Sequence, residues 1–79
     1  MPDEDWGTHG YEFISLSWAG ASKSGKTSIY LVTNNRTGAK LGIVRWFGRW
    51  RQYAFFPEPD CVFSAGCLHD IASFIKDSA

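Results

Sequence analysis

The sequence predicts an α+β domain: an antiparallel β-meander of three or four strands with one C-terminal α-helix packed on one face. Apolar and polar residues alternate with a period of two through most of the chain, and clusters of Gly, Asn, Ser and Pro separate the alternating runs. After Ser64 the apolar period changes to that of a helix. A length of 79 residues with 44% hydrophobic content fits one small domain.

The strands are expected in the first three quarters of the chain. Residues 1–10 are polar and acidic with two glycines, so we expect a flexible tail there and the domain in residues 11–79. Four later segments have the alternation or the β-branched and aromatic composition of strands. They are Tyr11–Trp18, Thr27–Thr33, Ala39–Phe47 and Gln52–Phe56. Strict alternation would place Leu41 and Gly42 on opposite faces of the third of these strands.

The helix is expected over residues 65–77, with Ser64 as its N-cap. Apolar residues recur there at i, i+3, i+4 and i+7, which predicts an amphipathic helix of about three turns. The expected buried stripe is Leu68, Ile71, Ala72 and Ile75, widened by Phe74. The expected polar side is His69, Asp70 and Ser73.

The segment Gly20–Thr27 reads GASKSGKT and matches the phosphate-binding pattern G-x-x-x-x-G-K-[ST] at every specified position. That motif requires a helix starting at the lysine, whereas the following residues SIYLVTN predict a strand. A hydrolase would also need a carboxylate for magnesium, and no acidic residue occurs between Phe13 and Pro57. We therefore expect a loop between strands, in which Lys23 and Lys26 either contact a phosphate or are simply solvated.

The net charge is zero, but the charges are segregated. The eight acidic residues lie at the two ends of the chain, and seven of the eight basic residues lie in the acid-free middle. This asymmetry indicates an anionic partner. No apolar run approaches the ~20 residues that cross a bilayer, so no membrane association and a cytoplasmic location are expected. Cys61 and Cys67 are expected to be reduced structural thiols, and their spacing does not predict a metal site.

Arginine and aromatic residues interleave in RWFGRWRQY, residues 45–53. A guanidinium can bind a phosphate bidentately, and an aromatic face can stack on a base. With the two loop lysines, the candidate ligand-binding residues are Lys23, Lys26, Arg45, Trp46, Arg49, Trp50, Arg51 and Tyr53. The alternative is structural: Trp46 and Tyr53 in the core, Arg45 covering an apolar edge, and Arg49 paired with an acid such as Glu58.

An enzyme is not expected. His9 lies in the predicted tail and His69 on a helix face, and neither has a nucleophile and an orienting acid nearby in the sequence. No cofactor and no metal are predicted. The small size favours a homo-oligomer, because a single small core gives limited stability.

From Lys40 onward the chain resembles small phage- and prophage-encoded proteins that share an LG-x-x-x-W, WRQY-x-F-x-P and CL-x-DI-x-x-F core. The resemblance implies a phage accessory role. Combined with the arginine and tryptophan segment, it predicts a non-enzymatic anti-defence protein that sequesters a nucleotide-derived signalling molecule. Two other functions stay open: a protein-binding inhibitor of a host defence factor, and a single-stranded nucleic-acid-binding protein.

Overall fold

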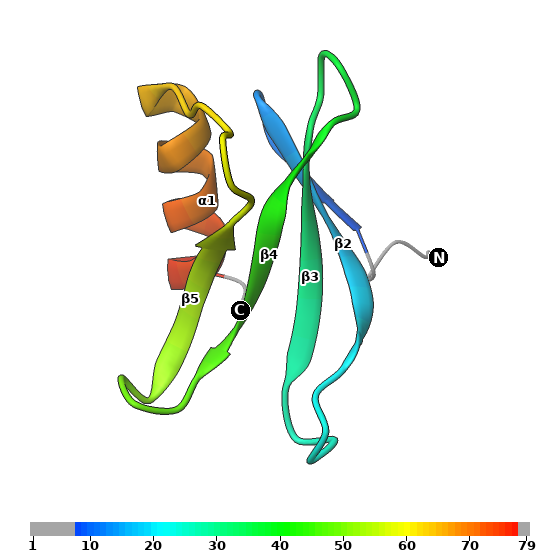
Figure 1. Ribbon diagram of the computed structural model, residues 1–79, viewed down its shortest axis with the longest axis vertical. Coiled ribbons are helices and arrows are strands. Elements are labelled where there is room, and N and C mark those ends of the chain that lie inside the picture. The colour runs from blue at the N-terminus through cyan, green and yellow to red at the C-terminus, as the bar shows by residue number, and fades with distance from the viewer. Residues whose placement is uncertain (1–7, 78–79) are drawn as a thin grey trace.

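The computed structural model describes residues 8–77, which form one antiparallel sheet and one helix (Figure 1). The elements in chain order are β1 (Thr8–Gly10), β2 (Ile14–Ala21), β3 (Ser28–Asn34), β4 (Lys40–Phe47), β5 (Gln52–Pro57) and α1 (Ala65–Asp77). The strands follow one another in the order β1-β2-β3-β4-β5, each antiparallel to its neighbour. This confirms the predicted α+β meander with a C-terminal helix.

The sheet has five strands, so the prediction of three or four was wrong. The additional strand is β1, which lies within the predicted tail and pairs with β2 through His9 opposite Leu16. A strand of three residues containing a glycine has no alternation to detect, and only its hydrogen bonds to β2 define it. Residues 1–7 of the predicted tail lie outside the described residues.

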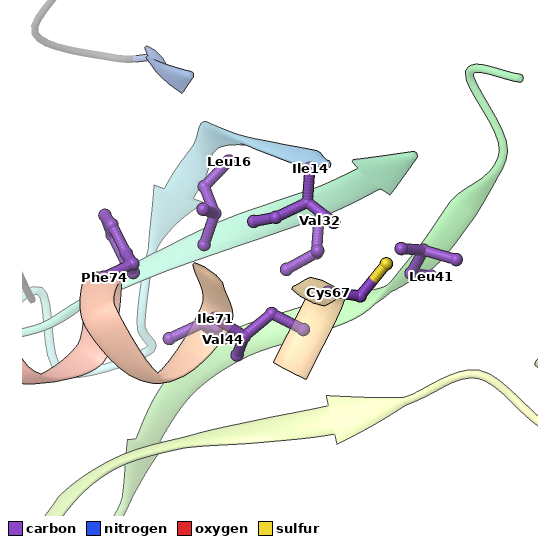
Figure 2. Packing of buried hydrophobic residues seen from close by; sticks show 8 residues of the cluster. All are labelled: Ile14, Leu16, Val32, Leu41, Val44, Cys67, Ile71 and Phe74. Atoms are coloured by element: carbon purple, nitrogen blue, oxygen red, sulfur yellow. The ribbon is translucent and has the colours of Figure 1, made fainter. Parts of the chain in front are cut away.

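The core lies between α1 and one face of the sheet, which we call the inner face. Alternate residues of β2, β3 and β4 point toward the helix, and α1 contributes three buried side chains (Figure 2). The buried cluster is Ile14, Leu16, Val32, Leu41, Val44, Cys67, Ile71 and Phe74. The Phe74 ring also packs edge-on against Tyr30 and His9, with ring centres 4.8 and 5.0 Å apart.

The helix begins at the predicted residue, but it buries a different face from the one that the sequence predicts. Ser64 caps it: its Oγ accepts the N–H of Cys67 at 3.2 Å. The buried positions are Cys67, Asp70, Ile71 and Phe74, whereas Leu68 is 50% exposed. The predicted stripe was therefore wrong at Leu68 and Ala72, and Asp70 is not on the polar side.

Asp70 is buried because its carboxylate has a partner from the sheet. Its Oδ2 accepts the backbone N–H of Phe13 at 2.9 Å. Phe13 lies in the connection between β1 and β2, and its ring lies where a side chain on Gly66 would be. A hydrogen bond to a carboxylate offsets part of the cost of burying it, so Asp70 anchors the helix to this connection.

A register shift in β4 corrects the predicted alternation. Gly42 pairs with Val32 but Lys40 pairs with Thr33, which leaves Leu41 as an extra residue. Leu41 and Gly42 are both buried, so they do not lie on opposite faces. A Cβ at Gly42 would lie 2.3 Å from the Phe56 carbonyl oxygen, so only glycine fits there beside β5.

Candidate functional site

Two hairpin turns, β2–β3 and β4–β5, lie at the same end of the sheet, beyond the C-terminal end of α1 (Figure 1). The turns carry four of the eight basic residues of the chain, and Arg45 lies near the same end of β4. The meander thus gathers cations that are far apart in the sequence. Lys40 instead lies at the opposite end of β4, where it forms a 3.3 Å ion pair with Glu58.

The β2–β3 turn contains the sequence that resembles a phosphate-binding loop. A strand, β3, follows it at Ser28, so the helix that the motif requires is absent and the predicted loop between strands is confirmed. The loop uses several of its N–H groups internally: Ser22 donates to the Thr27 carbonyl at 2.8 Å and Gly25 to the Ser22 carbonyl at 2.9 Å. The side chains of Lys23 and Lys26 are both exposed at this turn, where they can contact an anion.

A hollow of about 650 Å³ lies between the β2–β3 turn and β4. We call it the loop hollow. Its basic and aromatic lining is Lys23, Lys26, Arg45 and Trp46, with Ser22 and Ser24 beside them. No acidic side chain of the described residues lines it. The fold thus brings together four of the eight predicted site residues, two from each of two distant segments.

The β4–β5 turn is short and conformationally constrained. Trp50 donates its N–H to the Phe47 carbonyl at 3.1 Å, and Arg51 to the Gly48 carbonyl at 3.2 Å. Arg51 has a φ of 55°, in the left-handed region that side chains other than glycine adopt at a cost. The turn leaves the Trp50 side chain 64% exposed.

A second hollow, of about 640 Å³, lies between this turn, β5 and the last turns of α1. We call it the helix hollow. Its lining includes Trp46, Trp50, Arg51, Tyr53, Ile75 and Lys76. Trp46 therefore lines both hollows. Its indole meets the Tyr53 ring edge-on, with ring centres 5.5 Å apart.

Two of the predicted site residues have evident structural roles. The Tyr53 hydroxyl accepts the N–H of Ser28 at 3.1 Å, and its half-buried ring packs against the core. The Arg45 guanidinium lies 4.0 Å above the Phe56 ring centre, a cation–π arrangement. The structural alternative therefore holds for Tyr53. Arg45 places its guanidinium over an apolar ring and also lines the loop hollow, and Trp46 is 38% exposed and does not lie in the core.

Arg49 lines neither hollow, so the structure does not bring it together with the other candidates. Lys76 does line the helix hollow, and sequence reasoning missed it. As a basic residue in the last helical turn it looked like an ordinary solvated side chain. Nothing in the local sequence indicates that α1 ends beside Trp46 and Arg51.

The outer face of the sheet, opposite α1, is also distinctive. The registers place Leu31, Ile43 and Phe56 in one row across β3, β4 and β5 on this face. Phe47 extends the row toward the turn and meets Trp50 and Phe56 edge-on, with ring centres 4.9 and 5.9 Å apart. The one helix of residues 8–77 packs on the inner face, so no described helix covers this apolar surface.

The described residues contain no group of three or more His, Cys, Asp or Glu side chains that could hold a metal ion. His69 is exposed on α1, and His9 packs against Tyr30 and Phe74. Cys61 and Cys67 are both free. Within residues 8–77, no helix has the length and apolar character needed to cross a membrane.

The chain is similar to one small phage protein of unknown role. It is 31% identical over 65 residues to an uncharacterised 9.3 kDa protein of Acholeplasma phage L2. The aligned segment covers 82% of this chain and 78% of the phage protein. No family model and no solved structure matches the chain.

Proposed function

This chain belongs to the same family as the uncharacterised Acholeplasma phage L2 protein, and we propose that it is a non-enzymatic phage accessory protein that sequesters a nucleotide-derived signalling molecule. It would act in the cytoplasm of the host cell, against a defence system that uses such a signal. The family relationship supports the phage role. The chemistry of the site supports the ligand class.

The observation that carries the proposal is the composition of the loop hollow. Lys23, Lys26 and Arg45 surround one cavity with Trp46 in its wall, and no described acidic side chain opposes them. The two lysines can bind the phosphate, Arg45 adds positive charge to the wall, and the indole can stack on the base at about 1–3 kcal/mol. A volume of about 650 Å³ lies within the roughly 300–1,000 Å³ of small-molecule sites.

Titration calorimetry with AMP, ADP-ribose and cyclic dinucleotides tests this proposal, with thermal denaturation as a second readout. We expect at least one to bind with a Kd well below millimolar. Lys26→Ala should weaken that ligand by about tenfold, which corresponds to ~1.4 kcal/mol, and leave the melting temperature unchanged because the side chain is exposed. The matched control is Arg36→Ala, an exposed cation outside both hollows. If none of the nucleotides binds at millimolar concentration, the proposal fails.

We also propose that the chain forms a homo-oligomer through the outer face of its sheet. The apolar row Leu31, Ile43 and Phe56 crosses three strands of this face without a described helix over it, and a second copy would remove that surface from water. Light scattering should give a dimer mass for the parent protein and a monomer mass for Ile43→Lys, because lysine would charge the centre of this face. A monomeric parent protein would contradict the dimer.

The outer face also favours the alternative function, a protein-binding inhibitor of a host defence factor. Phe47, Phe56 and the exposed Trp50 are the residue types that dominate protein interfaces. A monomer that binds no nucleotide but co-purifies with a host protein would support this alternative. A single-strand binder is the third possibility, and it would lose affinity linearly with the logarithm of salt concentration.

The motif of the phage and prophage resemblance fits a structural role as well as a binding one. Leu41 and Gly42 form the register shift of β4, and Cys67, Asp70, Ile71 and Phe74 form the buried side of α1. Trp46 lies in the wall of both hollows. We propose that proteins with this motif share the sheet, the helix and the Trp46 wall.

A further inference from the structure

The loop hollow and the helix hollow share one lining residue, Trp46. Their volumes are nearly equal, about 650 and 640 Å³, and each falls in the range of a complete small-molecule site. A ligand with one nucleotide unit would reach the basic side chains of one hollow and leave those of the other without an anion. The arrangement suits a ligand with two similar halves.

Both hollows have basic side chains and no described acidic ones. Lys23, Lys26 and Arg45 line the loop hollow, while Arg51 and Lys76 line the helix hollow. Each set can bind an anionic group. Each hollow also offers an aromatic surface, from Trp46 in both and from Trp50 in the helix hollow, on which a base can stack.

We propose that the ligand is a dinucleotide with one nucleotide unit in each hollow, its terminal phosphate beside Lys23 and Lys26 and its linking phosphate beside Arg51 and Lys76. This inference rests on the proposed function and narrows its ligand from a nucleotide to a free dinucleotide. Two linked units bind more tightly than either alone, because binding of the first raises the effective concentration of the second. The loop hollow has three basic side chains and the helix hollow has two, so we expect a mononucleotide to bind in the loop hollow.

Titration calorimetry with AMP, the linear dinucleotide pApA and a twelve-nucleotide deoxyadenylate strand tests the inference at one fixed salt concentration. We expect pApA to bind at least roughly a hundredfold more tightly than AMP, the lower end of the gain from linking two sites. Per dinucleotide step, the strand should bind no more tightly than pApA. A strand whose affinity per dinucleotide step exceeds that of pApA would overturn the free dinucleotide in favour of single-stranded nucleic acid.

Variants separate the two hollows. Lys26→Ala should lower the affinity for both AMP and pApA, because both ligands occupy the loop hollow. Arg51→Gly and Lys76→Ala should weaken pApA at least about tenfold more than they weaken AMP. Arg36→Ala, at the opposite end of the sheet and outside both hollows, is the charge-matched control and should affect neither ligand.

The outcomes distinguish this inference from the function on which it rests. If AMP binds and pApA binds no more tightly, the dinucleotide inference is wrong while nucleotide binding stands. The same follows if pApA loses no more affinity than AMP in Arg51→Gly and in Lys76→Ala. If neither ligand binds, both are wrong.

Discussion

Replacing Arg51 with glycine should move stability and ligand affinity in opposite directions. Arg51 adopts a φ of 55° in the β4–β5 turn, where an L-residue carries a cost of roughly 1–2 kcal/mol and glycine carries none. Glycine also increases the conformational entropy of the unfolded chain, which lowers the stability of the fold by roughly 0.5–1 kcal/mol. The mid-range values predict that Arg51→Gly stabilises the fold by about 0.75 kcal/mol. For a domain of this size that raises the melting temperature by roughly 3–6 °C.

The same change should weaken binding of the dinucleotide. Arg51 lines the helix hollow, and a hydrogen bond from a charged group to a ligand contributes about 1.5–3 kcal/mol. We expect the Kd for pApA to rise by roughly ten- to a hundredfold. A residue that lowers stability but increases affinity is typical of a binding site, because backbone strain is retained where function requires the side chain.

Thermal denaturation by circular dichroism and calorimetric titration measure the two effects on the same sample. The matched control is Arg49→Gly, an arginine in the same turn without a positive φ and outside both hollows. It should destabilise the fold by about 0.4–1 kcal/mol and leave the Kd unchanged. A lower melting temperature for Arg51→Gly would refute the strain argument, and an unchanged Kd would refute the role of Arg51 in binding.

Three further predictions concern the fold and are checked by chemical denaturation. Ile71→Ala should lower the free energy of unfolding by about 2–5 kcal/mol and Leu68→Ala by less than about 0.5 kcal/mol, because Ile71 is buried and Leu68 is half exposed. Similar losses in the two variants would mean that the helix buries a different face. Gly42→Ala should cost at least about 2 kcal/mol, since its Cβ would overlap the backbone of β5; a neutral result would show that β5 is not this close. Asp70→Ala should lower the free energy of unfolding by about 1.5–3 kcal/mol by leaving the Phe13 N–H unpaired. Asp70→Asn keeps an acceptor and should recover most of that loss. Equal losses in the two variants would show that this hydrogen bond does not stabilise the fold.

The sequence alone determined the elements whose signals are local. The strands β3, β4 and β5 lie within one residue of their predicted bounds, whereas β2 (Ile14–Ala21) begins and ends three residues later than the predicted Tyr11–Trp18. The helix bounds and the Ser64 cap were also predicted correctly. Each of these depends on the residue itself and on neighbours within four or five positions, so propensity and periodicity are enough to find it.

The tertiary structure decided the features that depend on a distant partner. The spacing i, i+3, i+4, i+7 fits Cys67, Asp70, Ile71 and Phe74 as well as it fits the predicted stripe, but hydrophobicity argues against a buried aspartate. The Phe13 N–H, 57 positions away, donates the hydrogen bond that offsets part of the cost of that burial. The register shift at Leu41 likewise arises from pairing with β3.

The candidate site also has one part that the sequence predicts and one part that only the tertiary structure decides. Residue types and the acid-free middle of the chain identified the basic and aromatic candidates, because charge and ring chemistry belong to single residues. Which of them share a hollow was decided by the antiparallel order of the strands, which places the β2–β3 and β4–β5 turns at one end. The conformation of the β4–β5 turn leaves Arg49 outside both hollows, and the packing of α1 brings Lys76 into one of them. Proximity between distant segments is a property of strand pairing and helix packing, and no local pattern in the chain encodes it.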